Sequence, residues 1–263
     1  MYVVSPSTPR SAGAHMLPTL YNVRFSLSYL PSLRPRRVCH HPERSDSCVT
    51  SPPIATTRKP LFTILVACTA NICRSPLAAF SLEQRLRPAG PDGLFAVTSA
   101  GTRARPGDRI CPCVGEELAS DHAGRRYAHG HTSRRVTEAM IEAADLILLP
   151  DFENRTRIAL LDPVARHRSF TLREADRLLA SLAAEGLPPL RDVVPVMHAI
   201  RSRAAMSAGS RRWLQLRRPS DGLDILDGHN LGSRRHRRTV RDVGLTSSSI
   251  AARLEESALV DRV

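Results

Sequence analysis

Three residues with the chemistry of phosphoryl transfer stand close together in the chain: Cys68, Arg74 six positions later, and Ser75. A cysteine thiolate is a strong nucleophile. The planar fork of an arginine can hold two phosphate oxygens and stabilise the charge of a phosphoryl transition state. A serine hydroxyl can donate a hydrogen bond to the thiolate and help it leave. The spacing therefore indicates transfer of a phosphoryl group to and from Cys68.

The elements around this spacing are typical of an anion site. Residues 62–67 form an apolar run with β-branched members, which predicts a buried parallel strand, and Pro76 is suited to the first turn of a helix over 76–86. A loop between such a strand and helix turns its N–H groups toward one point, where the helix dipole adds partial positive charge. We expect an anion there and Cys68 as a thiolate. The alternative, a buried cysteine and an unrelated surface arginine, explains this setting less well.

Residues 68–76, CTANICRSP, resemble the phosphate-binding loop of the low-molecular-weight protein tyrosine phosphatases, whose usual form is C-x-G-N-x-C-R-S-P. The resemblance implies that Cys68 attacks phosphorus and that Arg74 binds phosphate oxygens together with the backbone of the loop. It implies substrate-binding roles for Thr69, Ala70, Asn71, Ile72, Cys73 and Ser75. Ala70 stands where the family usually has glycine, so a positive φ or a close backbone approach at this position would strain the loop.

Two further segments resemble parts of the family that support this loop. The run SAGT at 99–102 ends a predicted strand, and the resemblance implies that Ser99 supports the loop by hydrogen bonds. His131, three residues before Arg134, matches an H-x-x-R segment and is expected to hydrogen-bond Asn71. The same region also reads as a helix N-terminus, with position 132 or 133 capping a helix that ends at 143.

The mechanism needs an acid that protonates the leaving oxygen and then a base that activates water. The family supplies an aspartate, usually followed by proline, in a loop before its last helix. Asp227 stands in that place before a predicted helix over 233–256, with Gly228 where proline is usual. We prefer Asp227 to Asp224 and to Asp162, which does precede a proline but lies too early in the chain. The alternative is that all three aspartates only make turns.

Strand and helix patterns alternate four times along the chain. This alternation predicts a four-stranded parallel sheet with helices on both faces, as in the low-molecular-weight phosphotyrosine phosphatases, with the ligand at the carboxyl end of the first strand. The predicted strands are 62–67, 94–99, 144–149 and 168–171, and the later helices are 112–120, 152–161 and 172–184.

The two ends of the 263-residue chain differ in composition. Residues 1–60 are rich in Ser, Pro and Arg and are predicted to be a disordered basic extension. Residues 61–263 are expected to form the phosphatase domain, with an atypical insertion at about 190–220 that contains a helix over 193–206. The insertion is expected to present a solvated basic face.

Charge and cysteine content restrict the partners and the location. A net charge of +13 with only 4% aromatic residues and no nucleic-acid motif favours acidic or phosphorylated partners over specific nucleic-acid binding. No apolar run has the length of a membrane span, and six cysteines without a secretory signal favour a reducing compartment. We therefore expect a soluble, cytoplasmic phosphatase of phosphotyrosine proteins or small phosphate monoesters.

No cofactor and no metal are expected for catalysis, because the loop supplies the positive charge that a metal would otherwise bring. The group Cys39, His40, His41 and Cys48 in the basic extension is interpreted as incidental rather than as a metal site. Cys73 is close enough along the chain to Cys68 to form a disulfide with it, so we expect reversible inactivation by peroxide.

Two other functions stay open. An arsenate reductase of the same fold needs a cysteine relay, for which Cys111 and Cys113 are the downstream candidates in the core. A catalytically weak phosphate- or phosphopeptide-binding module is suggested by Ala70 and Gly228. Within the phosphatases, those acting on phosphoarginine tend to carry threonine where this chain has Ile72, which favours phosphotyrosine.

Overall fold

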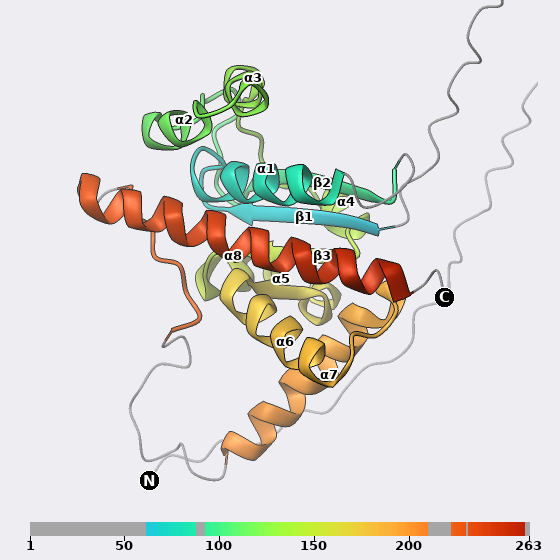
Figure 1. Ribbon diagram of the computed structural model, residues 1–263. Coiled ribbons are helices and arrows are strands. Elements are labelled where there is room, and N and C mark those ends of the chain that lie inside the picture. The colour runs from blue at the N-terminus through green and yellow to red at the C-terminus, as the bar shows by residue number, and fades with distance from the viewer. Residues whose placement is uncertain (1–61, 88–92, 210–221, 230, 261–263) are drawn as a thin grey trace, which may run out of the picture. The chain divides into compact units, whose positions relative to one another are not determined.

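The core of the protein is a four-stranded parallel sheet with the strand order β2-β1-β3-β4 (Figure 1). It is seen in a computed structural model that describes residues 62–87, 93–209, 222–229 and 231–260. The strands are β1 (Phe62–Cys68), β2 (Phe95–Gly101), β3 (Leu146–Leu149) and β4 (Ser169–Thr171). The predicted parallel sheet is confirmed. The predicted extension, 1–60, and the end of the predicted insertion, 210–220, lie outside the described residues.

Helices cover both faces of this sheet, as expected. Alternate side chains of β1 point to opposite faces: Ile64 and Val66 belong to one buried cluster, and Leu65 and Ala67 to another. The first cluster is closed by α1, α6 and α8, and the second by α4 and α5. The helices are α1 (Arg74–Leu86), α2 (Pro112–Leu118), α3 (His122–Gly130), α4 (Glu138–Glu142), α5 (Phe152–Leu161), α6 (Leu172–Glu185), α7 (Leu190–Gly209) and α8 (Ser233–Val260), with a 3-10 turn, η2 (Val164–His167).

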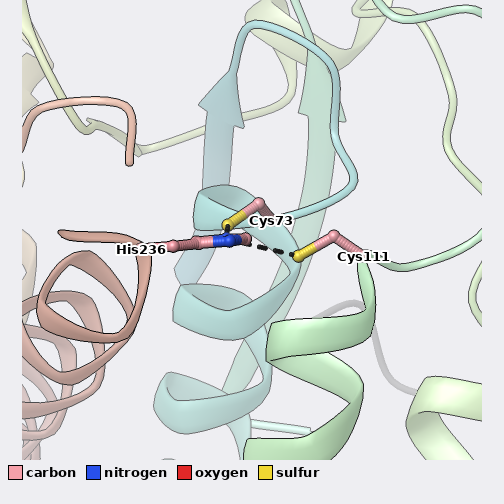
Figure 2. A group of neighbouring side chains, drawn as sticks. All are labelled: Cys73, Cys111 and His236. Carbon is pink, nitrogen blue, oxygen red and sulfur yellow. Dashed lines mark hydrogen bonds between the residues drawn. The ribbon is translucent and has the colours of Figure 1, made fainter. Parts of the chain in front are cut away.

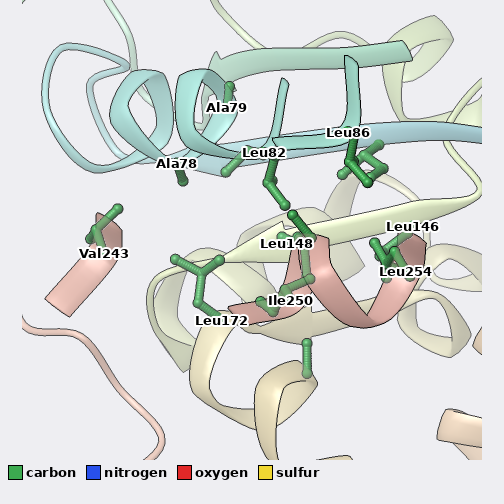
Figure 3. Close-up of a cluster of buried hydrophobic side chains, with 14 of the residues drawn as sticks. Ala78, Ala79, Leu82, Leu86, Leu146, Leu148, Leu172, Val243, Ile250 and Leu254 are labelled. Carbon is green, nitrogen blue, oxygen red and sulfur yellow. The ribbon is translucent and has the colours of Figure 1, made fainter. Parts of the chain in front are cut away.

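The long C-terminal helix α8 packs on helices from both the early and the later part of the domain. It packs along α1 and α6, and its side chains Val243, Ile250 and Leu254 belong to the same buried cluster as Ala78 and Leu82 of α1 (Figure 3). The small residue Ala78 of α1, fully buried on the same face, lets the two helices approach closely. This packing brings the first turn of α8 beside the loop that precedes α1.

One local prediction between β2 and β3 is wrong, and one helix was not predicted. The unpredicted helix, α3, packs Ala123, Tyr127 and Ala128 against the larger cluster. It begins after Asp121, whose carboxylate accepts the N–H of Gly124 at 2.7 Å. The helix expected to start near 133 begins at Glu138, with Thr137 as its N-cap. Ser133 is instead buried, where its hydroxyl donates to the carbonyl of Arg105.

The first part of the predicted insertion belongs to the hydrophobic core. Helix α7 is longer at both ends than the expected 193–206, and Leu190, Val193 and Met197 are buried in the same cluster as residues of α6 and α8. The expectation of a solvated basic face is therefore wrong for this part of the segment. Over the residues that the structure describes, no helix combines the length and the apolar character needed to cross a membrane.

Candidate active site

Cys68 ends β1 and is surrounded by hydrogen-bond donors. Its Sγ lies 3.0 Å from the hydroxyl of Ser75, and the backbone N–H of Asn71 points at it from 3.3 Å. The Ser75 hydroxyl has one proton and a second acceptor nearby, the carbonyl of Ala100 at 3.1 Å. When the sulfur is charged, it is the stronger acceptor of the two. These donors suit a thiolate that must attack and later leave.

Asn71 holds the loop in its unusual backbone conformation. It is fully buried, and its φ of 57° is the only positive φ among the described residues other than glycine. Its side-chain Nδ2 donates to the hydroxyls of Ser75 (2.9 Å) and Ser99 (3.0 Å), and its Oδ1 accepts the N–H of Arg134 at 3.0 Å. Ser99, expected to support the loop, is therefore brought into contact with it through Asn71.

His131 contacts Asn71 as expected, but through the backbone. Its Nε2 lies 2.8 Å from the Asn71 carbonyl, which can only accept, so Nε2 carries the proton. Burial lowers the pKa of His131; the bond to Asn71 opposes this, and the charges of Arg134 and Arg109 add to the lowering. Tyr127 stacks on the imidazole with ring centres 5.8 Å apart. A neutral, immobilised histidine thus buttresses the loop.

Arg74 is buried beside Cys68 with only 3% of its side chain exposed, and two carboxylates hold its guanidinium. Nη1 lies 2.6 Å from Asp151 and also donates to the Ile225 carbonyl, while Nη2 lies 2.7 Å from Asp227. Burial opposes the charge, but Cys68, Asp227 and Asp151 outweigh it and raise the pKa of Arg74. Of its five N–H groups, the Nε–H and one on Nη2 are left for a ligand, and they form one bidentate edge.

Asp227 is one of the two aspartates that the fold places beside Arg74, and it is the more exposed of them. Its second oxygen accepts the N–H of His229 at 3.0 Å, and its side chain is 46% exposed, so solvent can exchange its proton. The following residue, Gly228, packs against α8: a Cβ there would lie 2.6 Å from Thr239 Oγ1 and 2.7 Å from His236 Cα. Glycine in place of the family's usual proline is therefore a packing requirement here.

The two alternative aspartates have local partners. Asp224 accepts the N–H of Phe152 at 3.1 Å, at the start of α5. Asp162 accepts the N–H of Val164 at 2.9 Å and pairs with Arg168 at 3.2 Å. Both contribute to turns and helix ends. The preference for Asp227 as the acid rests on its contact with Arg74.

Asp151 is a site residue that the sequence analysis missed. Its Oδ2 contacts Arg74, and its Oδ1 accepts the backbone N–H of Asn154 at 2.8 Å, which caps α5. The side chain of Asn154 is buried and connects Asp151 to the hydroxyl of Thr102. A signal was present: Asp151 follows the strand that pairs with β1, and carboxyl ends of adjacent parallel strands share one edge.

The strain expected at Ala70 is absent. Positive φ falls on Asn71 instead, so Ala70 needs no glycine backbone. The close approach falls on Gly101, which is paired with Cys68 across the sheet: a Cβ there would lie 2.7 Å from the Thr69 carbonyl. The first condition for strain at this position, a positive φ, is therefore not met at Ala70.

The side chain of Cys73 is buried against α8 and the residue that precedes α2. Its Sγ lies 3.0 Å from His236 Nε2, and Cys111 Sγ lies 3.6 Å from the same nitrogen (Figure 2). A hydrogen bond from Cys73 is the main cause that lowers the pKa of Cys111 to about 6, and the same bond raises the pKa of Cys73. The Cys73 side chain is thus engaged with His236, so we expect Cys73 to contact a ligand in the loop through its backbone N–H. The sequence analysis did not connect these three residues.

The loop, the parallel sheet and the buried arginine define a cysteine-dependent phosphate-binding protein, and comparisons with known proteins give the family. Residues 63–186 match the family described as low molecular weight phosphotyrosine protein phosphatase. The chain is 33% identical over 111 residues to a protein-arginine-phosphatase of Bacillus subtilis, covering 42% of this chain and 70% of the relative. It is 34% identical over 115 residues to a probable low molecular weight protein-tyrosine-phosphatase, EpsP, of Ralstonia nicotianae, covering 44% and 73%.

A solved structure agrees with the fold. The YwlE arginine phosphatase, in a cysteine-to-serine mutant with a phosphorylated active-site serine, superposes with a TM-score of 0.50 at 22% identity, covering 76% of this chain and 99% of that one. The chain belongs to the low-molecular-weight phosphotyrosine protein phosphatase family.

Proposed function

We propose that this protein is a phosphotyrosine-protein phosphatase that hydrolyses phosphate monoesters through a cysteinyl-phosphate intermediate. The observation that carries the proposal is the position of Arg74, buried beside Cys68 and held by Asp227 at 2.7 Å. Nucleophile, phosphate-binding cation and acid are thereby combined at the carboxyl end of β1. The family's relatives named as phosphatases favour this reading over arsenate reduction.

In the first step, the Cys68 thiolate attacks phosphorus, forming the S–P bond while the P–O bond to the leaving group breaks. Arg74 and the N–H groups of residues 69–73 and 75 bind the phosphate oxygens and stabilise their charge. The protonated carboxyl of Asp227 gives its proton to the leaving oxygen. The partial exposure of Asp227 keeps it within reach of a substrate bound in the loop.

In the second step, Asp227 accepts a proton from water as that water attacks the phosphocysteine. The S–P bond breaks, and the Ser75 hydroxyl donates to the returning thiolate from 3.0 Å. Inorganic phosphate leaves, and the enzyme is restored. No step in this sequence needs a metal, because the loop and Arg74 carry the positive charge.

Phosphotyrosine is the preferred substrate class, and phosphoarginine is the second candidate. Ile72, half-buried in the loop, replaces the threonine typical of the arginine phosphatases and favours phosphotyrosine. The 33% identity to the Bacillus subtilis protein-arginine-phosphatase is the observation that favours phosphoarginine. We further propose a cytoplasmic location, which fits the free thiols of Cys68, Cys73, Cys111 and Cys113.

The test is hydrolysis of p-nitrophenyl phosphate, a phosphotyrosine peptide and a phosphoarginine peptide by the full chain and by Cys68→Ser. We expect phosphate release by the wild type, fastest from the phosphotyrosine peptide, and a loss of roughly 10⁴-fold or more in Cys68→Ser. Rapid acid quenching and mass spectrometry should find one phosphate on Cys68. A wild type that binds phosphate but hydrolyses none of the three substrates would replace the proposal with a binding module, and arsenate-dependent oxidation of thioredoxin would replace it with a reductase.

A further inference from the structure

Cys73, Cys111 and His236 form a buried group that the catalytic steps do not use. They come from three different elements: the residue before α1, the residue before α2 and the first turn of α8. Their exposed fractions are 5%, 3% and 9%. Two thiols and an imidazole buried in contact with one another form a set of ligands that suits a metal ion.

We propose that Cys73, Cys111 and His236 bind one Zn²⁺ ion through two thiolates and an imidazole nitrogen. Thiolate and imidazole are the ligands that zinc takes in structural sites, where it is almost always four-coordinate and tetrahedral. Binding converts both thiols to thiolates and releases their protons to solvent. The fourth position falls to water or to the exposed imidazole of His229, whose ring centre lies 5.2 Å from that of His236.

The spacing of the three ligand atoms suits a zinc ion. With Zn–S about 2.3 Å and Zn–N about 2.0 Å, the edges of a tetrahedron are about 3.5 to 3.8 Å long. His236 Nε2 lies 3.0 Å from Cys73 Sγ and 3.6 Å from Cys111 Sγ, and all three atoms lie within 4.8 Å of one another (Figure 2). An ion can therefore enter after side-chain shifts of up to about one ångström.

A zinc ion here would tie α8 to the phosphate-binding loop. Cys73 directly precedes Arg74, and His236 packs on Gly228, the neighbour of Asp227. The ion thus joins the loop that contains Cys68 to the segment that contains Asp227. Neither Cys68 nor Asp227 is a ligand of the ion. This role is structural and separate from the metal-free catalytic steps proposed above.

The test is a zinc titration of the full chain, reduced and freed of metal, against a chromophoric chelator. Cys39 and Cys48 are replaced by serine, and His40 and His41 by alanine, so that the basic extension cannot supply ligands. We expect one zinc per chain and a higher melting temperature with zinc. Cobalt should give the thiolate charge-transfer absorption and the intense visible bands of a tetrahedral site. His236→Ala and Cys111→Ser should each weaken binding at least tenfold.

Two matched controls decide where the ion binds. Cys113→Ser changes the half-buried cysteine two positions from Cys111 and should keep both zinc affinity and activity. Cys68→Ser should abolish hydrolysis and keep the affinity, which separates this proposal from the phosphatase assignment. Loss of binding in Cys68→Ser would place the ion at the nucleophile and overturn the proposal, as would unchanged affinity in both His236→Ala and Cys111→Ser. Circular dichroism checks that each variant is folded.

Discussion

Two cysteines of one short loop have opposite surroundings. Cys68 faces the edge of the sheet, where a backbone N–H, a hydroxyl and the charged Arg74 surround its sulfur. Cys73 faces the interior between α2 and α8, where another thiol and an imidazole are its partners. The difference shows that a thiol's chemistry follows from the groups packed around it: donors and a cation suit a nucleophile, whereas soft ligands suit a metal.

The largest effect that separates the two regions is expected from Asp227→Asn. Asparagine keeps an oxygen for Arg74 but cannot give or take the proton, so kcat should fall by about 10² to 10⁴-fold. The loss should be greatest for substrates with a basic leaving oxygen and smallest for p-nitrophenyl phosphate. Steady-state kinetics with aryl phosphates of graded leaving-group pKa measure it, and zinc affinity should not change.

Asp224→Asn is the matched control for this acid, because Asp224 lies in the same segment and accepts the N–H of Phe152 at the start of α5. Its kcat should stay close to that of the wild type. Equal losses in the two variants, or a loss in Asp224→Asn alone, would remove Asp227 from the role of acid.

The second largest effect is expected from Asn71→Ala, which removes the hydrogen bonds that support the loop around Cys68. Alanine loses the bonds to Ser75, Ser99 and Arg134 and must adopt a φ of 57°, so unfolding should become easier by about 2 to 4 kcal/mol. Asn71→Gly loses the same bonds without the backbone cost and should be about 1 kcal/mol more stable than Asn71→Ala. Urea denaturation of both variants measures the difference, and equal stabilities would mean that the backbone carries no strain.

His131→Gln should change the pH dependence of stability. Because burial lowers the pKa of His131 below its ordinary 6.5, the unfolded chain takes up this proton more readily than the folded one. The stability that a neutral His131 contributes is therefore present above pH 6.5 and is lost as the pH falls below that value.

Glutamine keeps a donor for the Asn71 carbonyl but does not titrate, so its stability should fall less between about pH 7.5 and pH 5. Urea midpoints at several pH values provide the comparison. Parallel pH profiles for the wild type and His131→Gln would contradict the lowered pKa.

Ala70→Gly should have the smallest effect and tests the one departure from the family within the loop. Because the backbone at Ala70 is unstrained, glycine offers no relief and adds freedom to the unfolded chain, so stability should fall by less than about 1 kcal/mol. Activity should stay near that of the wild type. A several-fold gain in kcat/KM would show that alanine does hinder phosphate binding.

Local sequence patterns were enough to predict much of the fold and several residues of the candidate site. The apolar strand, the small polar loop and Pro76 predicted β1, the loop and α1, because such signals act between residues close in sequence. The resemblance added Ser99, His131 and Asp227 to Cys68 and Arg74, and the structure brings all of these to one edge of the sheet. The alternation of strands and helices predicted the parallel sheet, since parallel strands need crossover connections.

Other features depended on packing between distant segments. Asp151 lies 77 positions after Arg74 in the chain. The two residues can form an ion pair only because β3, which precedes Asp151, lies beside β1. Helix α3 packs Ala123, Tyr127 and Ala128 on the core, and Ser133 donates a hydrogen bond to the Arg105 carbonyl in place of capping a helix. Propensity describes only the nearest few residues, so these outcomes follow from which segments the core brings together.

The sequence by itself determined the strand, the loop and the order of elements, and it placed Cys68 and Arg74 in one loop, because these features depend on short-range backbone and side-chain chemistry. Only the tertiary structure decided that the positive φ falls on Asn71 and not Ala70, that Asp227 and Asp151 both lie beside Arg74, and that Cys73 meets Cys111 and His236. The physical reason is that α8 docks along α1, and this docking joins Cys73 to His236, which lies 163 positions further along the chain.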